Sequence, residues 1–375
     1  MNKISNILIG TICIFIIIGI LLAGLWPFNF HLQNRVQWIE EGNGIHFYAR
    51  GIAYSASFLT TEKTPFIDTD EITIEIWLES DDDTNRLLTH IITFFDSEGA
   101  ELFTLAQSKT ALFVIRNLKK NQSKKGLWTH IPFRDTLFAG NKRFVTVTSN
   151  KGRTSIYFDG EQKKSIRNAF RLLQENRRLS PKFTLGSALT GKNPWVGTIF
   201  GLAIYNRALS REEVFESYQT WLDHGSPETS GKKIPSELYL FEEQEGMVVN
   251  NRIPGKQNLI IPKRYRIFRK IILEQPKESF RSTKKDVIIN ILGFIPLGFI
   301  LLAYLSRSTR LPASILWLLA ILSGTGLSLA IELIQVYLPM RISSLTDLIC
   351  NSSGTAIGVI IYGMGSYLRN KVFSP

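Results

Sequence analysis

Residues 5–26 read SNILIGTICIFIIIGILLAGLW, an apolar run without a single charged side chain. A helix needs about 20 apolar residues to cross a bilayer, so this run is long enough to span one. A cleaved signal peptide has an apolar core of about 7–15 residues and ends in a small-x-small site, which this run lacks. The sequence therefore predicts an uncleaved transmembrane helix within residues 1–27.

Three further apolar runs follow near the C-terminus, at about 287–305, 312–338 and 346–367. Cytoplasmic loops of membrane proteins carry an excess of basic residues. If both termini are cytoplasmic, the cytoplasmic side receives Lys3, Arg307, Arg310, Arg369 and Lys371, and the short outer loop between the last two spans carries only Arg341. The basic residues before the second span belong to the long exported section, whose charge has little weight because long loops translocate largely regardless of charge. We therefore expect a multi-pass protein of the bacterial cell membrane, with residues 28–285 extracytoplasmic and residues 369–375 as a cytoplasmic tail.

Between the first and second spans the chain reads like a water-soluble β protein. Short runs alternate apolar and polar residues, as in ITIEIWL at 72–78 and RFVTVT at 143–148. This alternation, with β-branched and aromatic residues, predicts half-buried strands, and Asp159-Gly160 is typical of a tight hairpin turn. Residues 28–222 thus predict an all-β antiparallel sandwich, followed by a linker and an additional β segment at 223–262.

Three stretches in this region resemble the laminin-G-like, concanavalin-type jelly roll: ITIEIWLES, VTVTSNKGRTSIYFDGE and WVGTIFGLAIYNRALSREEV. The resemblance implies a domain of a class that often binds carbohydrate or calcium, although a fold does not define a ligand. Asp81, Asp83 and Asn85 have the opening spacing of a calcium loop, but Arg86 replaces the required glycine and Ile92 the closing acid. We read them as a solvated acidic turn, and we predict no metal site, no cofactor and no catalytic residue in this domain.

The formal charge of +12 gathers partly in residues 263–285, directly before the second span. Basic groups at such a position are explained by anionic lipid headgroups better than by nucleic acid, since no nucleic-acid-binding module accompanies them. The run KRYRIFRKIILE at 263–274 alternates basic and apolar residues, which predicts an interfacial helix on the membrane surface. The predicted lipid-surface residues are Arg264, Arg266, Arg269 and Lys270.

The most informative chemistry lies inside the C-terminal spans. Charged groups at membrane depth are costly and are usually paired or functional. Spacings of three or four residues place an acid and a carboxamide on one face of each of three helices, and the positive-inside topology puts all of them, with one arginine, in the outer-leaflet half. The predicted site is Asp286, Asn290, Glu332, Gln335, Arg341, Asp347 and Asn351.

Two interpretations of this polar cluster stay open from the sequence. The first is a set of interhelical hydrogen bonds that specify packing, closed by an ion pair of Arg341. The second is a binding site for a polar or anionic headgroup. The step Gly354-x-x-x-Gly358 continues the line of Asp347 and Asn351, and it predicts close helix packing next to the cluster.

The order and spacing of these residues resemble the VanZ-like family of bacterial membrane proteins. The resemblance rests on DVIINILGFIPLGF at 286–299, ELIQ at 332–335 with Pro339-x-Arg341, and Asp347-Leu-Ile-Cys-Asn351-x-x-Gly354. WPFNF at 26–30 is similar to the end of that family's first helix. The resemblance implies a VanZ-like region at 286–368, a sandwich inserted after the first span, and an association with glycopeptide (teicoplanin) resistance whose mechanism the family name does not supply.

Three functional hypotheses follow. We favour a non-enzymatic envelope protein whose sandwich binds a glycan or another envelope component and whose helices engage a lipid headgroup or partner. The alternative is a membrane enzyme acting on a lipid-linked substrate, with Glu332 or Asp347 as acid or base. A transporter would require several four-span chains to assemble, and the sequence leaves the oligomeric state open.

Overall fold

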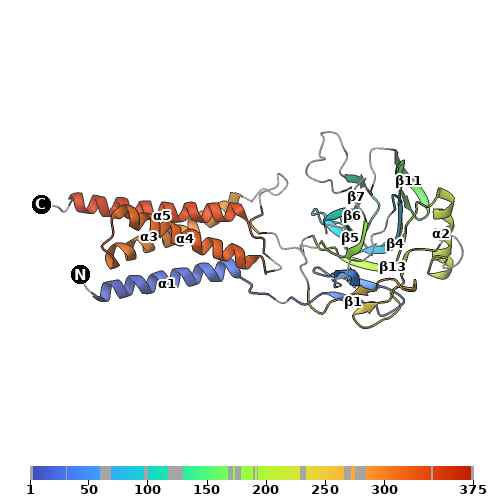
Figure 1. The fold of residues 1–375 in the computed structure, drawn as a ribbon, viewed down its shortest axis with the longest axis horizontal. Helices are drawn as coiled ribbons and strands as arrows, with labels where there is room; N and C mark the ends of the chain where they lie inside the picture. Colours follow the sequence, from blue (N-terminus) through green and yellow to red (C-terminus); the bar gives the residue numbers. More distant parts are fainter. Residues whose placement is uncertain are drawn as a thin grey trace. The chain divides into compact units, whose positions relative to one another are not determined.

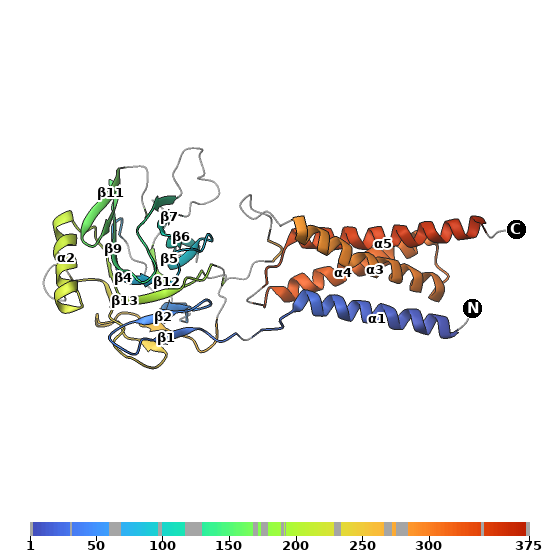
Figure 2. The same cartoon turned by 180° about the vertical axis from the view of Figure 1, so that it is seen from behind.

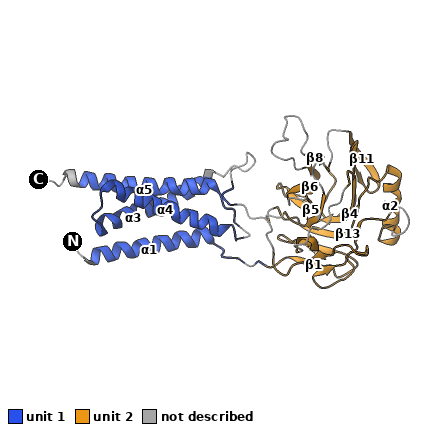
Figure 3. Ribbon diagram, viewed as in Figure 1, with its two compact units in different colours: residues 1–32, 269–375 blue, residues 33–268 orange. Residues whose placement is uncertain are grey.

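The computed structural model describes residues 3–30, 32–59, 69–96, 100–116, 130–167, 172–173, 179–188, 191, 193–228, 234–265, 272–274, 284–338 and 341–372. The chain forms two compact units, which Figure 1 and Figure 3 distinguish by sequence position and by colour. The first unit comprises residues 1–32 and 269–375, and the second comprises residues 33–268. Each unit is described by itself.

The first unit is a helical bundle. Within the described residues, four of its helices are long and apolar enough to cross a membrane: α1 (Lys3–Leu25), α3 (Lys284–Ser308), α4 (Ala313–Gln335) and α5 (Leu345–Val372). The start of α1 and the end of α5 lie at the same end of the bundle (Figure 1). At that end Arg307 Nη1 donates a hydrogen bond of 2.8 Å to Ser5 Oγ. The four spans predicted from the apolar runs are confirmed.

Glycines bring α3 and α5 into backbone contact. A Cβ atom at Gly354 would lie 2.2 Å from the carbonyl oxygen of Ile291, and one at Gly358 would lie 2.1 Å from that of Ile295. Real Cβ atoms essentially never approach so closely. The GxxxG step of α5 therefore packs directly on the backbone of α3, and this contact holds the two helices next to the polar residues one and two turns earlier.

The second unit is a sandwich of two antiparallel sheets, each of eight strands within the described residues. The first sheet contains, in spatial order, β1 (Val36–Trp38), β2 (Ile45–Phe47), β13 (Gly197–Tyr205), β4 (Ile72–Ser80), β9 (Lys142–Ser149), β10 (Arg153–Phe158) and β11 (Glu161–Arg167), with β14 (Glu237–Tyr239) also paired to β13. The second contains β15 (Val248–Val249), β16 (Leu259–Ile260), β3 (Ala53–Ser55), β12 (Leu179–Leu185), β5 (Thr89–Asp96), β6 (Glu101–Ser108), β7 (Ala111–Arg116) and β8 (His130–Phe133). The short 3-10 helix η1 (Ala56–Phe58) follows β3. The predicted jelly-roll-type sandwich is confirmed.

Alternating side chains from both sheets form the main core between them, including Ile74, Phe94 and Trp195. The predicted turn after β10 is a tight hairpin, because Asp159 (φ 51°) and Gly160 (φ 77°) both adopt the left-handed backbone conformation. Segments 237–260 belong to the same unit, since β14 pairs with β13 in one sheet and β16 pairs with β3 in the other.

The helix α2 (Arg211–His224) covers the outer face of the first sheet, as Figure 1 and Figure 2 both show. It begins at a capping box, in which Ser210 Oγ accepts from Glu213 N and the Glu213 side chain accepts from Ser210 N. It ends at Gly225 in the left-handed conformation. A second, smaller core lies between α2 and the sheet, and it includes Phe144, Tyr205 and Trp221.

The predicted interfacial helix at 263–274 lies mostly outside the described residues, as do Arg266, Arg269 and Lys270. The described ends of this range are not helical. Arg264 is exposed and forms a β-bridge with Gln33, and Glu274 forms one with Ser344. Backbone pairing at both ends competes with a helix that would run through the whole range, so the helix does not extend over all of 263–274.

Candidate functional site

A pocket in the bundle collects the polar side chains of its membrane helices. Its volume is about 360 Å³, and α1 contributes Ile20, Ala23 and Gly24 to its wall. Helices α1 and α4 end here and α3 and α5 begin here, so the pocket lies at the end of the bundle opposite the chain termini. All seven polar residues singled out in the sequence line it: Asp286, Asn290, Glu332, Gln335, Arg341, Asp347 and Asn351.

Burial increases from the mouth of this pocket to its floor. Asp286 and Arg341 are exposed, whereas Asn290 and Asp347 are half-buried. The exposed fractions of the remaining three side chains are small: Glu332 1%, Gln335 8% and Asn351 6%. The pocket therefore has charged groups at its entrance and buried polar groups at its floor.

Arg341 bonds to backbone carbonyl oxygens at the end of α1. Its Nε donates to the carbonyl oxygen of Trp26 at 2.9 Å and its Nη2 donates to that of Ala23 at 3.2 Å. Within the described residues no carboxylate lies within the 4.0 Å of an ion pair, so the ion pair expected from the sequence is not formed. The last carbonyls of a helix have no partner within the helix, and a cation there also matches the negative end of its dipole. Arg341 therefore caps α1.

Gln335 also attaches α4 to α1, because its Nε2 donates to the carbonyl oxygen of Gly24 at 2.8 Å. Glu332, one turn earlier on the same face, accepts a hydrogen bond of 2.6 Å from the backbone N–H of Ser344 at the start of α5. Gln335 thus acts as a hydrogen-bond donor and Glu332 as an acceptor. Their three-residue spacing, noted in the sequence, places both on the face of α4 that lines the pocket.

Asn351 occupies the floor. Its Nδ2 donates to Ser328 Oγ of α4 at 2.9 Å, and both residues are buried. Among the described residues its Oδ1 has no hydrogen-bond partner, although the atom is out of contact with solvent. A buried acceptor left unpaired costs free energy, about 1–3 kcal/mol, unless something else donates to it. The pocket therefore contains an acceptor whose partner is not part of the described chain.

The sandwich contains a second polar cluster that sequence reasoning missed. Glu75 is completely buried, and its Oε2 accepts from Tyr205 Oη at 3.0 Å, Ser217 Oγ at 2.9 Å and Trp221 Nε1 at 3.1 Å. Burial raises the pKa of the Glu75 carboxyl to about 7, and the three donors offset part of this rise. Since two of the donors belong to α2, the carboxyl attaches this helix to the sheet.

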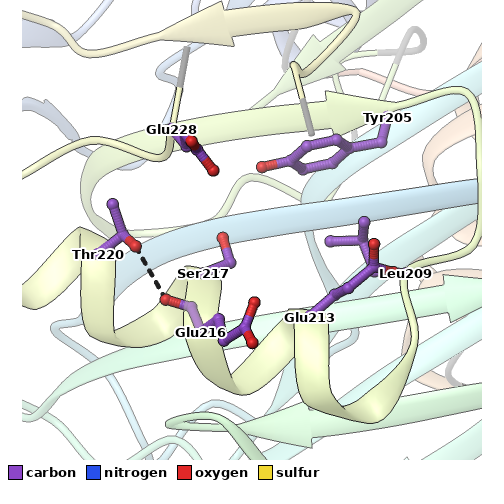
Figure 4. Close-up of a pocket in the computed structure, with 7 residues that line it drawn as sticks. All are labelled: Tyr205, Leu209, Glu213, Glu216, Ser217, Thr220 and Glu228. Atoms are coloured by element: carbon purple, nitrogen blue, oxygen red, sulfur yellow. Dashed lines mark hydrogen bonds between the residues drawn. The ribbon is translucent and has the colours of Figure 1, made fainter. Parts of the chain in front are cut away.

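The cavity next to this network is small. Figure 4 shows the side chains that line it: Tyr205, Leu209, Glu213, Glu216, Ser217, Thr220 and Glu228. Its volume of about 30 Å³ is the space of one or two water molecules. It is too small for a sugar ring, so it is a hydration site beside the α2 attachment rather than a ligand site.

A larger groove lies on the outer side of α2. It holds about 410 Å³ between the β10–β11 turn and the helix, and Gly160, Glu161, Arg211 and Phe215 are among its lining residues. Phe215 is 51% exposed, which is unusual for an aromatic residue with no partner in the core. An aromatic face beside charged side chains is a suitable surface for a polar ligand.

The side chains of the acidic turn have partners within the protein. Asp82 Oδ1 accepts from the backbone N–H groups of Thr84 and Asn85, whereas Asp83 Oδ2 accepts from that of Ala139. Among the described residues, no three His, Cys, Asp or Glu side chains are grouped so that they could hold a metal ion. The turn is therefore stabilised by its own carboxylates, in the way Asx turns generally are.

An acid–imidazole–hydroxyl sequence of contacts also occurs in the sandwich. His46 Nε2 lies 3.3 Å from Asp81 Oδ2, and its Nδ1 lies 2.9 Å from Thr198 Oγ1. His46 and Thr198 are direct cross-strand neighbours of β2 and β13, which explains their contact. Because only 8% of Thr198 is exposed, the hydroxyl serves the sheet and is not placed as a surface nucleophile.

Comparison with known proteins agrees with both units. Residues 54–215 match the model of the concanavalin A-like lectin/glucanases superfamily. Residues 217–366 match the VanZ/LLP1 family model, from within α2 to near the end of α5. The chain is thus a multi-span membrane protein with a lectin-type sandwich. Its C-terminal part is similar to the VanZ/LLP1 family, and its sandwich is similar to the concanavalin A-like lectin/glucanases superfamily.

Solved structures similar to the chain include a putative carbohydrate-binding protein from Bacteroides ovatus, at 14% identity and a TM-score of 0.40, covering 58% of this chain and 57% of that one. The ligand-binding domain of botulinum neurotoxin serotype D with N-acetylneuraminic acid is 16% identical, with a TM-score of 0.37 and coverages of 50% and 45%. The sialidase of Trypanosoma rangeli is 15% identical, with a TM-score of 0.38 and coverages of 52% and 30%. The chain therefore spans little more than half of the first of these proteins and less of the other two. No curated protein matches the chain.

Proposed function

We propose that this protein is a non-enzymatic component of the bacterial cell envelope, and that the pocket at the end of its bundle binds a lipid headgroup or the equivalent group of a partner. The observation that carries the proposal is the gathering of seven polar side chains around one accessible pocket, six of them from three membrane helices and one, Arg341, from the segment between α4 and α5. Interhelical hydrogen bonds alone would leave no pocket, and they contribute only about 0.6 kcal/mol each on average.

Native mass spectrometry of the purified full chain tests the lipid site. We expect lipid to stay bound to the unmodified protein and to be lost from the double variant Glu332→Gln/Asp347→Asn, which keeps the shape of the pocket. Ser353→Ala on α5 is the control, since Ser353 is exposed and bonds only to the carbonyl oxygen of Ile349 in its own helix. Equal lipid retention by all three proteins would contradict the proposal.

The orientation proposed from the sequence is that both termini are cytoplasmic and that the sandwich is extracytoplasmic. Its support is that the basic ends of the bundle are brought together, as the Arg307–Ser5 contact illustrates. Both native cysteines are buried, which allows single-cysteine labelling. A membrane-impermeant maleimide should label Lys163→Cys in intact cells and leave Thr309→Cys unlabelled; the opposite pattern would reverse the topology.

The sandwich is proposed to bind a glycan or another envelope component, and the groove beside Phe215 is the surface to test. The purified full chain would be titrated with cell-wall glycans, with Phe215→Ala as the variant and Leu222→Ala, another exposed residue of α2, as the control. Saturable binding that weakens about tenfold only in Phe215→Ala supports this surface, whereas the absence of saturable binding counts against the glycan half of the proposal.

A link to glycopeptide resistance follows from the VanZ-like region alone and is tested separately. The full chain and its Glu332→Gln/Asp347→Asn variant would be expressed in a susceptible host, and the teicoplanin concentration that inhibits growth would be compared. We expect the unmodified chain to raise this concentration and the variant to do so less. An unchanged inhibitory concentration would remove resistance from the proposed function and leave the lipid site unaffected.

The alternative is an enzyme in which Glu332 or Asp347 acts as acid or base on a lipid-linked substrate. Its support is that both carboxyl groups line the same pocket. The purified full chain would be incubated with lipid-linked envelope substrates, and turnover that disappears in Glu332→Gln would replace the non-enzymatic proposal by this one. Lipid binding without turnover would favour the non-enzymatic function.

A further inference from the structure

The pocket of the bundle has more hydrogen-bond acceptors than donors. Among the described residues that line it, Glu332 and Asp347 contribute carboxyl groups inside the pocket and Asp286 contributes one at its mouth, whereas Arg341 contributes a guanidinium group. A surface with this excess of carboxyl groups attracts a cation and repels an anion. The composition of the pocket therefore disfavours an anionic headgroup as its main ligand.

The donor groups of the pocket are already engaged within the protein: those of Gln335 and Arg341 with α1, that of Asn290 with Asp347, and that of Asn351 with Ser328. Gln335 Nε2 donates to Gly24 O, and Arg341 donates through Nε and Nη2 to two other carbonyl oxygens at the end of that helix. These bonds hold both donor groups against the wall of the pocket. The ligand consequently meets carboxyl and carboxamide oxygens more than it meets N–H groups.

The floor of the pocket gives an independent indication of the same chemistry. Asn351 is 6% exposed, its Nδ2 is bonded to Ser328, and its Oδ1 has no partner within the described chain. A ligand or an ordered water that donates a hydrogen bond satisfies such an atom. Asn351 lies one helical turn below Asp347 on the same face of α5, so one donor group can approach both residues.

We propose that this pocket binds a primary ammonium group, whose N–H bonds point to Asn351 Oδ1 and to the carboxyl oxygens of Glu332 and Asp347. An ammonium group has three N–H donors and one positive charge, which match the three acceptors. The inference rests on the proposed headgroup site and names its ligand class. The ammonium group comes either from an aminoethyl phospholipid headgroup or from a soluble amine.

The test compares headgroups that differ only in their nitrogen chemistry. The purified full chain would be titrated in native mass spectrometry with phosphatidylethanolamine, phosphatidylcholine and phosphatidylglycerol of identical acyl chains. Phosphatidylcholine keeps the positive charge but has no N–H donor, and phosphatidylglycerol has hydroxyl groups but a net negative charge. We expect the ethanolamine lipid to bind at least tenfold more tightly than the other two, which corresponds to about one hydrogen bond to a charged group.

Variants of the pocket residues show which side chains cause the preference for the ethanolamine lipid. Asp347→Asn keeps the shape of the side chain and should lower the preference about tenfold, and Asn351→Leu should do the same by removing the floor acceptor. Asn351→Asp retains an acceptor at that position and should retain the preference. Displacement of the bound lipid by free ethanolamine would assign the ammonium group to a soluble amine; resistance to displacement would assign it to the lipid.

The outcomes separate this inference from the function on which it rests. Saturable binding that is sensitive to the variants but equally tight for all three headgroups, or tightest for phosphatidylglycerol, would overturn the ammonium assignment and leave the lipid site in place. Lipid retention that is insensitive to every pocket variant would overturn both.

Discussion

The two units of this protein bury carboxyl groups in different ways. In the sandwich, Glu75 is fully buried, and its Oε2 accepts from three donors of one strand and one helix, while its Oε1 has no hydrogen-bond partner among the described residues. In the bundle, Glu332 is 1% exposed to solvent, yet it lines a pocket together with two other acids and an unpaired carboxamide oxygen. The buried acid of the sandwich attaches a helix, whereas the acids of the bundle line a pocket. The difference agrees with a structural function for Glu75 and with the recognition function that we propose for the bundle cluster.

The largest expected effect concerns what holds the bundle together. Gly354→Leu places a side chain where even a Cβ atom would lie 2.2 Å from the carbonyl oxygen of Ile291, so α3 and α5 have to separate. Overpacking of this kind costs about 1–3 kcal/mol and occasionally more. We expect a large drop in the thermal stability of the purified chain in detergent. Gly365→Leu on the same helix is the control, because nothing lies within 4 Å of a Cβ atom there. Equal melting of both variants would show that the polar residues, not the glycines, hold the helices.

The next prediction concerns the pH dependence of the attachment of α2 through the buried Glu75 carboxyl. The folded-state pKa of Glu75, about 7, lies above its ordinary value of 4.5. Its stabilising contribution is therefore complete below about pH 4.5 and is lost as the pH rises through 7, by roughly 3 kcal/mol in total. Hydrogen exchange of residues 211–224 should become faster over this range as α2 detaches more often.

Glu75→Gln removes that pH dependence, since glutamine resembles the protonated acid and keeps an oxygen for the three donors. We expect the variant to match the unmodified chain near pH 4.5 and to exchange more slowly at pH 8. Glu40→Gln, at an exposed position, should leave the profile unchanged. If the exchange rate of residues 211–224 depended on pH as steeply in Glu75→Gln as in the unmodified chain, the Glu75 carboxyl would not be the group that attaches α2.

A smaller effect is expected at the end of α1. Arg341→Ala leaves the carbonyl oxygens of Ala23 and Trp26 without their donor, at a cost of about 1–2 kcal/mol at this exposed position. Hydrogen exchange of the last turn of α1 should increase while that of α4 stays constant. Arg310→Ala, another exposed arginine outside the pocket, is the control. If Arg341→Ala left α1 unaffected, its two hydrogen bonds would not be holding the helix end.

The smallest effect decides between packing and recognition in the pocket. Glu332→Gln keeps an oxygen that accepts from Ser344 N, so we expect less than about 1 kcal/mol of lost stability, measured by thermal unfolding in detergent. Lipid retention should nevertheless fall, as described above. A loss of stability comparable with that of Gly354→Leu would mean that the cluster exists for packing.

Much of the architecture was accessible from the sequence for identifiable reasons. Uninterrupted apolar runs define the spans, and period-two alternation defines strands such as β4 and β9. The seven pocket residues are predictable from their depth in the membrane. The topology places the ends of α1 and α4 and the starts of α3 and α5 at the same membrane depth, and polar residues at the same depth in adjacent helices come together. Whether they bind a ligand stays a prediction.

Other features leave no local trace in the sequence. The donors to Glu75 are separated from it by 130 residues or more, so no spacing rule connects them. The partner of Arg341 is a pair of backbone carbonyl oxygens, which every residue has, and a carboxylate is the more obvious expectation. The joining of both sheets by β14 and β16 depends on strands of two or three residues, which are too short to show a period.

The central claim, that the pocket of the bundle binds a headgroup, is tested most directly by photo-crosslinking in native membranes. A photoreactive residue would replace Gly293, which lines the pocket and has nothing within 4 Å of its Cβ position, and in a second protein Gly365, equally unobstructed but outside the pocket. We predict headgroup-containing lipid adducts at Gly293 that disappear when Glu332→Gln and Asp347→Asn are added, and adducts at Gly365 that these changes do not affect. Adducts at Gly293 that persist unchanged in the double variant would contradict the claim.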